Sequence, residues 1–209
     1  MVREFVALML DAETAARLRA RVLPELEPLR ADLRLYDERD LHVTLGFLGT
    51  LEPGVAEPLA AALAPALGER PAPRLRLGRP GAFPDRGRPR VLWAGVEELH
   101  GGGDLAALAR VVRAVCAEHG LQLDRRPFRP HVTLARVRGP ARGRIPVSFY
   151  DREIAETWQP EAARWVLSPG AGGTPAYRPT HRFPLAPPRS PAPATDPAPG
   201  PARGPQRGA

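Results

Sequence analysis

The sequence predicts an α+β fold built from two pseudo-symmetric lobes, and three observations lead to this expectation. Strand-like and helix-like segments alternate along residues 1–185 without the regular strand–helix repeat of a parallel sheet. The tetrapeptide HVTL occurs at residues 42–45 and again at 131–134, 89 positions later, and each copy closes a unit that contains a helix. A chain of 209 residues can form one large domain or two small lobes. Each lobe should therefore present one copy of the repeat.

The individual elements follow from the spacing of apolar residues and from capping signals. Asp11 and Asp104 each offer an N-cap for a helix, and Pro53 lies where a first-turn proline opens one. Pro24 and Pro28 should kink the first helix or end it early. Strands are expected at residues 4–10, 33–36, 41–48, 74–78, 91–96, 130–137, 163–167 and 177–183, and helices after Asp11, from Pro53 to about residue 67, and from Asp104 to Gly120.

Composition and length exclude several classes of protein. No apolar run approaches the roughly 18 residues that a membrane span requires, so we expect no membrane association. The single cysteine, Cys116, excludes an internal disulfide framework and a cysteine-only zinc site. The segment before Asp11 carries Arg3 and Glu4 and lacks the apolar region of a signal peptide. These features predict a cytoplasmic location.

The formal charge of +7 comes entirely from arginine. All 30 basic residues are arginine, and the chain contains neither lysine nor asparagine. Because selection for arginine chemistry would not also remove asparagine, we interpret this pattern as a base-composition bias of the genome. The charge is therefore weak evidence for nucleic-acid binding, although Arg125, Arg126 and Arg129 flank the second repeat and could attract an anion there.

The composition changes after Leu185. Eight of the 24 residues in 186–209 are proline, and none is a large apolar residue. Such a segment cannot bury enough apolar surface to offset the entropy of ordering it. We therefore expect a folded body over residues 1–185 and a disordered, partly polyproline-II tail over residues 186–209.

The two His-x-Thr motifs carry the chemistry. Residues i and i+2 of a strand point to the same face, so His42 and Thr44 should project together. The same holds for His131 and Thr133. If the lobes pair about a pseudo-twofold axis, two imidazoles and two hydroxyls face each other across a groove. Two histidines on opposite sides of a phosphorus suit in-line displacement, one as base and one as acid, while hydroxyls donate to the phosphate oxygens. This chemistry needs no metal.

Two other interpretations of these motifs fit the sequence less well. A single His-x-Thr would indicate only a half-buried histidine on a strand, but two identical copies in matching contexts favour a site. Zinc binding by His42 and His131 fits less well, because no Cys, Asp or Glu follows at ligand spacing.

In its paired His-x-Thr motifs the chain resembles the two-histidine phosphoesterase superfamily. Within that superfamily it is similar to the RNA 2',3'-cyclic phosphodiesterases, also called 2'-5' RNA ligase-like proteins. The resemblance covers residues 1–185 and not the tail. The chain departs from the family pattern at Leu35 and Tyr36, where many members carry an arginine–tryptophan pair. The segments that carry the resemblance are FVALML at the N-terminus, DLHVTLGFLG at 40–49, GAFPDRGRPRVLWAGV at 81–96, RRPFRPHVTLARVR at 125–138, and a closing stretch with Ser168, Gly173, Tyr177 and RFPL at 182–185.

The resemblance implies a bilobed two-histidine phosphoesterase fold, with two antiparallel-rich sheets around a central groove and helices on the outside. It also implies that His42 is the proton donor and His131 the proton acceptor, although the pseudo-symmetry leaves the reverse assignment open. Thr44 and Thr133 are implied to bind substrate.

Two further substrate-binding residues are implied by the resemblance alone. Arg136 matches a family arginine that binds phosphate or base, and Phe47 matches an aromatic residue near the base. Each lies at an odd offset from its histidine and should point away from it on a regular strand. A bulge or the end of the strand must intervene if the assignment holds. For Phe47, a buried core position is the alternative.

The family reaction opens the 2',3'-cyclic phosphate of an RNA end to a 2'-phosphomonoester, and relatives also join RNA ends by reversible 2'-5' ligation. The resemblance implies no cofactor and no metal, a monomeric protein, and RNA ends or small cyclic nucleotides as partners. The alternatives are a related phosphoesterase acting on another cyclic nucleotide or a 2'-5' oligonucleotide, a non-catalytic RNA-end or nucleotide-binding protein, and general nucleic-acid binding through arginines.

Overall fold

A computed structural model describes residues 2–99, 102–124, 126–138, 145–168 and 177–189. The strands are β1 (Arg3–Met9), β2 (Leu33–Leu35), β3 (His42–Gly49), β4 (Leu75–Phe83), β5 (Val91–Glu98), β6 (His131–Val137), β7 (Thr157–Trp158), β8 (Ala162–Ser168) and β9 (Arg178–Pro184). The helices are α1 (Ala12–Leu26), α2 (Ala56–Gly68), α3 (Asp104–Glu118) and α4 (Val147–Asp151), with short 3-10 helices η1 (Glu27–Asp32) and η2 (Glu38–Asp40) on either side of β2.

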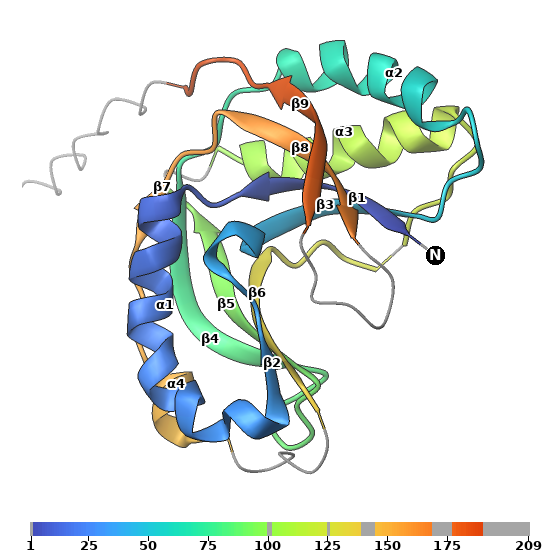
Figure 1. The fold of residues 1–209 in the computed structure, drawn as a ribbon. Helices are drawn as coiled ribbons and strands as arrows, with labels where there is room; N and C mark the ends of the chain where they lie inside the picture. Colours follow the sequence, from blue (N-terminus) through green and yellow to red (C-terminus); the bar gives the residue numbers. More distant parts are fainter. Residues whose placement is uncertain (1, 100–101, 125, 139–144, 169–176, 190–209) are drawn as a thin grey trace, which may run out of the picture.

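The strands form two antiparallel groups that meet at one seam (Figure 1). One lobe has the order β3-β1-β8-β9, and the other has the order β7-β4-β5-β6. The groups join where β3 pairs with β6 through Val43 and Val132, so the two lobes form one continuous curled sheet. From Ala135 onward β2 takes over the same edge of β6. The expected α+β bilobed fold is confirmed.

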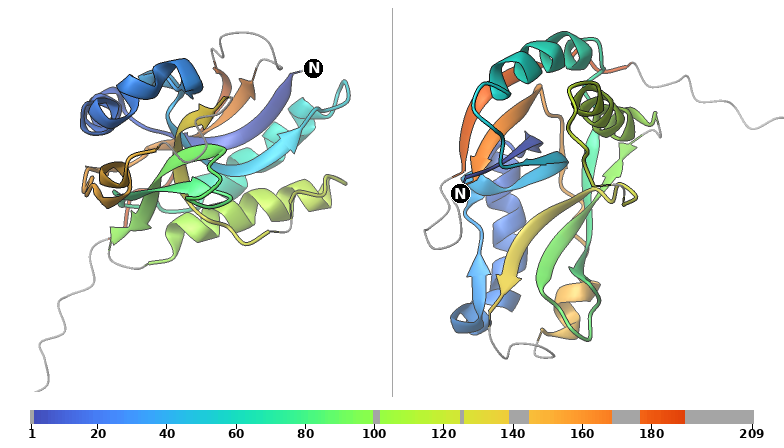
Figure 2. Two further views of the ribbon diagram at one scale, coloured as in Figure 1. Left: turned by 90° about the horizontal axis from the view of Figure 1, so that it is seen from below. Right: turned by 90° about the vertical axis from the view of Figure 1, so that its right-hand side faces the viewer.

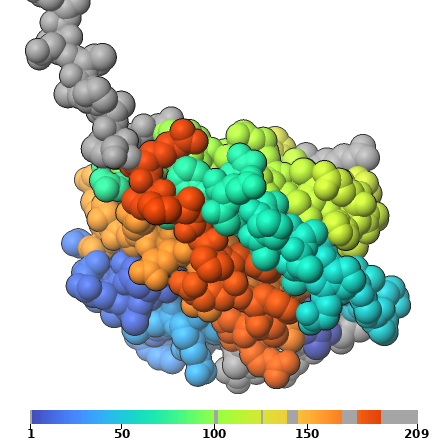
Figure 3. All heavy atoms as spheres, turned by 90° about the horizontal axis from the view of Figure 1, so that it is seen from above, coloured from blue at the N-terminus to red at the C-terminus, as the bar shows by residue number. Residues whose placement is uncertain are grey.

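The helices cover the outer faces of the curled sheet (Figures 1 and 2). Helices α2 and α3 pack against each other on the lobe that contains β3 and β9. From above, α2 lies between β9 and α3 (Figure 3). Helices α1 and α4 lie beside the β4 side of the other lobe. Within the described ranges, none of the helices combines the length and apolarity needed to cross a membrane.

Most expected elements are present, and the differences have local causes. The helix expected to open at Pro53 begins at Ala56, because Gly54 has a φ of +86° that a helix cannot contain. Strand β4 continues to Phe83 rather than ending at residue 78. A register shift between Leu77 and Pro80 lets the strand pass through a residue that has no N–H to donate. The short elements α4 and β7 were not expected.

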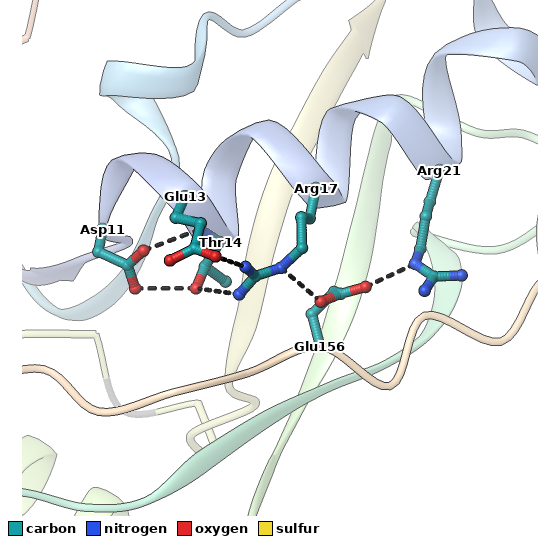
Figure 4. A network of polar contacts seen from close by, with 6 residues as sticks. All are labelled: Asp11, Glu13, Thr14, Arg17, Arg21 and Glu156. Atoms are coloured by element: carbon teal, nitrogen blue, oxygen red, sulfur yellow. Dashed lines mark hydrogen bonds and ion pairs between the residues drawn. The ribbon is translucent and has the colours of Figure 1, made fainter.

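Helix α1 begins as the sequence predicts and is held by ion pairs from a distant segment (Figure 4). The Asp11 carboxylate accepts the Thr14 N–H at 2.8 Å, which is the expected N-cap. The Arg17 Nε donates to one oxygen of Glu156 at 2.8 Å, and the Arg21 Nε donates to the other at 2.6 Å. Because Glu156 immediately precedes β7, these contacts fix α1 against the β4–β7 edge of the sheet.

The described C-terminal segment remains attached to the body beyond Leu185. The Ala186 N–H donates to the Arg70 carbonyl, and the Ala186 carbonyl accepts the Ala72 N–H, both at 2.9 Å. The Arg189 Nε donates to an Asp104 carboxylate oxygen at 3.1 Å, at the start of α3. The folded body therefore includes residues 186–189, which were expected to belong to the tail. The remainder of the expected tail, residues 190–209, lies outside the described residues.

This attachment predicts different effects for two truncations. Removing residues 190–209 should leave the free energy of unfolding unchanged. Removing residues 186–209 should lower it by about 1–3 kcal/mol, because two backbone hydrogen bonds and the ion pair to the buried Asp104 are lost. Urea denaturation of the two truncated proteins and the full chain measures the difference. Equal stability of both truncations would contradict the role of residues 186–189.

Candidate active site

Strands β3 and β6 bring the two HVTL repeats together. They pair antiparallel through Val43 and Val132, the second residue of each repeat. Both valines are fully buried, so they point into the core. The histidine and threonine of each repeat therefore point to the opposite face of the sheet.

The antiparallel register places each histidine beside the threonine of the other repeat. The two histidines are then diagonal neighbours across the seam. They are close enough for the charge of His131 to lower the pKa of His42. The structure thus gathers the four motif residues predicted from the sequence, which are His42, Thr44, His131 and Thr133.

Both imidazoles are held by the same kind of hydrogen bond. The Nδ1 of His42 lies 2.6 Å from the carbonyl oxygen of Asp40, and the Nδ1 of His131 lies 2.7 Å from the carbonyl oxygen of Arg129. Because a carbonyl oxygen can only accept, Nδ1 must carry the hydrogen in each ring. Nε2 is then the nitrogen that gains or loses a proton, and in both rings the anchor lies two residues before the histidine.

Burial lowers the pKa of both histidines. At His42 the main cause is desolvation, and the nearby charge of His131 acts in the same direction. The hydrogen bond to Asp40 opposes both effects. The net result is that the pKa of His42 falls from 6.5 to about 4. Desolvation also lowers the pKa of His131, against the hydrogen bond to Arg129. In the free protein at neutral pH, His42 is therefore neutral and its Nε2 can accept a proton.

A bulge in β3 places Phe47 on the face of the motif residues. In the pairing with β1, Thr44 lies opposite Ala7 and Gly46 opposite Val6, so Leu45 is the extra residue. A Cβ on Gly46 would come within 2.8 Å of Val112 in α3, which shows that this residue faces the helix side. Phe47 therefore returns to the other face, where it is 63% exposed. The alternative of a buried phenylalanine is wrong.

A bulge at the equivalent point of β6 does the same for Arg136. Thr133 lies opposite Trp93 and Ala135 opposite Leu92, so Leu134 is the extra residue. Leu134 and Ala135 are both buried, and Arg136 is exposed on the face of Thr133. The bulge that the family assignment required is therefore present in both strands.

Aromatic rings surround His42. The Phe5 ring stacks on the imidazole with centroids 4.7 Å apart, and the Tyr177 ring meets it edge-on at 5.2 Å. Phe5 also contacts Phe47, with centroids 6.0 Å apart. These apolar walls account for the desolvation of His42. Phe5 and Tyr177 were not expected at this site. Residues 5–10 are all apolar, so the sequence alone does not show which face of the strand Phe5 occupies.

The surroundings of His131 are also aromatic. Phe83 meets this imidazole edge-on at 5.0 Å, and Trp93 lies 6.3 Å from it. The Trp93 ring lies directly over Gly81 of β4, where a Cβ would come within 2.2 Å of the ring. Only glycine leaves room for this ring. Both aromatic residues lie in a segment that carries the family resemblance, which is the signal that could have placed them in the site.

Tyr36 links Arg136 to the first lobe. The Nε of Arg136 donates to the Tyr36 hydroxyl oxygen at 3.0 Å, and the Tyr177 hydroxyl donates to the same oxygen at 3.3 Å. Of the expected basic cluster, Arg126 forms an ion pair with Asp124, and Arg125 lies outside the described residues. Among the residues that the structure describes, no group of three His, Cys, Asp or Glu side chains could hold a metal ion.

A model of the 2'-5' RNA ligase superfamily matches residues 10–164, a range that includes both repeats. The chain belongs to this superfamily. The resemblance found in the sequence is confirmed.

Two relatives from the superfamily carry the name RNA 2',3'-cyclic phosphodiesterase. The protein from Geobacillus stearothermophilus is 45% identical over 100 residues, which cover 47% of this chain and 31% of the relative. The chain thus spans less than a third of that relative's length. The protein from Thermus thermophilus is 33% identical over 188 residues, which cover 88% of this chain and 90% of the relative.

Solved structures of the superfamily share the fold. A crystal structure of a protein from Thermus thermophilus aligns with a TM-score of 0.73 and 32% identity, covering 88% of this chain and 97% of that one. E. coli LigT, crystallised with 3'-AMP, aligns with a TM-score of 0.66 and 28% identity, covering 88% of this chain and 97% of LigT.

The lowered pKa of His42 predicts an acid-sensitive fold. In the unfolded chain this imidazole takes up a proton near pH 6.5, whereas in the folded protein it does so only near pH 4. The free energy of unfolding is therefore highest above pH 6.5 and falls as the pH drops toward 4. Between pH 7 and pH 4 the wild type should lose about 3 kcal/mol more than His42→Asn, which can keep the bond to Asp40. Urea denaturation at a series of pH values measures this difference. Parallel losses in both proteins would show that His42 titrates normally.

Proposed function

We propose that this protein hydrolyses the 2',3'-cyclic phosphate end of RNA to a 2'-phosphomonoester. The observation that supports this most directly is the pair of imidazoles on one face of the seam, each held through Nδ1 and each with a neighbouring threonine. The names of the superfamily relatives point to the same substrate. The complex of LigT with 3'-AMP supports a nucleotide as the ligand.

The reaction needs two proton transfers on opposite sides of phosphorus. In the proposed mechanism, Nε2 of His131 takes a proton from a water molecule as its oxygen bonds to phosphorus. The bond from phosphorus to the 3'-oxygen breaks, and Nε2 of His42 gives its proton to that oxygen. The phosphate stays on the 2'-oxygen. The protons move without a metal ion.

The remaining site residues bind the substrate in this proposal. Thr44 and Thr133 lie beside the imidazoles, where their hydroxyls donate to the non-bridging phosphate oxygens. The guanidinium of Arg136 adds a charged donor for the same anion. The exposed ring of Phe47 supplies a flat apolar surface for the nucleobase.

The proposed roles require the substrate to change the protonation of His42. In the free protein its pKa is about 4, so the ring carries no proton to donate at neutral pH. A phosphodiester anion at the site raises the pKa of both rings by opposite charge. Because His42 is desolvated more strongly, it is the ring whose protonation depends most on the bound anion.

The same proton transfers allow a second reaction of the superfamily. If the 5'-hydroxyl of another RNA replaces water, its oxygen bonds to phosphorus and the product is a 2'-5' linkage. We propose that the protein acts as a monomer in the cytoplasm on RNA ends and small cyclic nucleotides.

Loss of either motif histidine should abolish hydrolysis. His42→Ala and His131→Ala should each lower kcat/KM for an oligonucleotide with a 2',3'-cyclic phosphate end by about 10²–10⁴-fold, because each removes one proton transfer. The assay runs on EDTA-treated protein, with product identity established by ³¹P NMR. His119→Ala is the matched control, since His119 bonds the Val115 carbonyl through Nδ1 at the end of α3. Full activity of His131→Ala, or loss of wild-type activity with EDTA, would contradict the mechanism.

A sulfur-substituted substrate distinguishes the acid from the base. When sulfur replaces the 3'-oxygen, the leaving thiolate has a conjugate acid near the thiol pKa of about 8.5 and departs without a proton donor. His42→Ala should then regain most of the wild-type rate, whereas His131→Ala should remain inactive. Rates of both variants on the oxygen and sulfur substrates give the answer. Rescue of His131→Ala instead would show that the two roles are reversed.

A further inference from the structure

A continuous chain of contacts joins Arg136 in one lobe to His42 in the other. It starts at the Arg136 Nε, which donates to the Tyr36 hydroxyl oxygen at 3.0 Å, and this oxygen also accepts the Tyr177 hydroxyl at 3.3 Å. The backbone N–H of Tyr177 donates to a carboxylate oxygen of Asp40 at 3.2 Å. The carbonyl of Asp40 holds Nδ1 of His42 at 2.6 Å. Each step lies within hydrogen-bond distance.

Tyr36 is fixed in this position by its buried side chain and by its backbone. Its side chain is only 6% exposed and belongs to the main hydrophobic core. Its backbone N–H donates to the Leu134 carbonyl at 3.0 Å, at the bulge that turns Arg136 toward the site. The same tyrosine therefore contacts β6 at the bulge through its backbone and contacts the Arg136 side chain through its hydroxyl.

The contact with Tyr36 determines which donors Arg136 offers to a ligand. A guanidinium has five N–H donors in a fixed plane, one on Nε and four on the terminal nitrogens. Among the described residues, Tyr36 is the one that hydrogen-bonds to this group, and it uses Nε. The terminal nitrogens then form a forked pair of donors, the geometry that binds phosphate oxygens in a bidentate manner.

We propose that Tyr36 is a positioning residue: its hydroxyl orients the Arg136 guanidinium so that the terminal nitrogens face the phosphate, and Tyr177 and Asp40 fix that orientation relative to His42. This proposal rests on the proposed function, in which Arg136 binds the substrate phosphate. It assigns to Tyr36 a role in anion binding and not only in packing.

The packing contribution of the ring can be separated from that of the hydroxyl. The rings of Tyr36 and Tyr177 stack with centroids 5.9 Å apart and an interplanar angle of 24°. Tyr36→Phe keeps this stacking and the core packing and removes only the oxygen. A folded variant is therefore expected, and thermal denaturation checks it.

The decisive measurement is a double-mutant cycle between Tyr36→Phe and Arg136→Ala. Alone, Tyr36→Phe should raise KM for the cyclic phosphate and the inhibition constant for inorganic phosphate by the same factor of about ten. The change in kcat should be much smaller. These effects are expected for the loss of a hydrogen bond to a charged group. In the Arg136→Ala background, Tyr36→Phe should have no further effect, because the group it orients is gone. The same factor in both backgrounds would overturn the proposal.

Tyr150→Phe is the matched control. The Tyr150 hydroxyl is buried and has no hydrogen-bond partner among the described residues, and its ring lies under the Arg86 guanidinium, away from the motifs. Removing that hydroxyl should leave KM and phosphate inhibition unchanged. A tenfold effect there would show that loss of any tyrosine hydroxyl disturbs the site, and would contradict a specific role for Tyr36.

A binding measurement separates this proposal from the proposed function. Calorimetric titration of inorganic phosphate into the wild type, Tyr36→Phe and Arg136→Ala requires no turnover. Weaker binding by both variants supports the positioning role even if the wild type does not hydrolyse the cyclic phosphate, in which case the proposed function alone fails. If Arg136→Ala weakens phosphate binding and Tyr36→Phe does not, the positioning role is wrong while the proposed function stands.

Discussion

The backbone pairing of Val43 with Val132 is the contact on which the rest of the site depends, because within the described part of the chain it is where β3 and β6 meet. In each repeat the histidine lies one residue before the paired valine and the threonine lies one residue after it. Burial of the two valines turns these polar side chains to the opposite face. Beyond the pair, β2 occupies the edge of β6, so the lobes cannot pair further and the strands diverge from the motif residues outward.

Two β-bulges make the two sides of the site chemically different, although the paired repeats themselves are alike. Each bulge follows a motif threonine and brings the residue five positions after the histidine onto the motif face. In one lobe that residue is Phe47, which has an apolar ring, and in the other it is Arg136, which has a charged guanidinium. The same backbone irregularity thus places an exposed aromatic ring on one side of the motif face and a guanidinium on the other. The aromatic rings around each histidine exclude water and lower the pKa of both imidazoles.

The fold class and the motif residues could be predicted from sequence because they follow local rules. Alternation of apolar residues indicated the strands, and the repeated tetrapeptide indicated two related lobes. Strand parity placed each histidine with its threonine. Parity also showed that Phe47 and Arg136 needed a bulge, but it could not locate one, because a bulge depends on pairing with β1 or β5. Tyr36 and Tyr177, 141 residues apart, meet only through the long-range arrangement of strands, so no local pattern indicated their contact.

The seam has the form of an interface between two copies of one unit, since the same tetrapeptide lies antiparallel against itself. A unit with one repeat would hold one histidine and one threonine, and would gather all four motif residues only by associating with its twin. Because both halves lie in one chain, the two sides of the seam need not be identical, and phenylalanine and arginine occupy the equivalent positions 47 and 136.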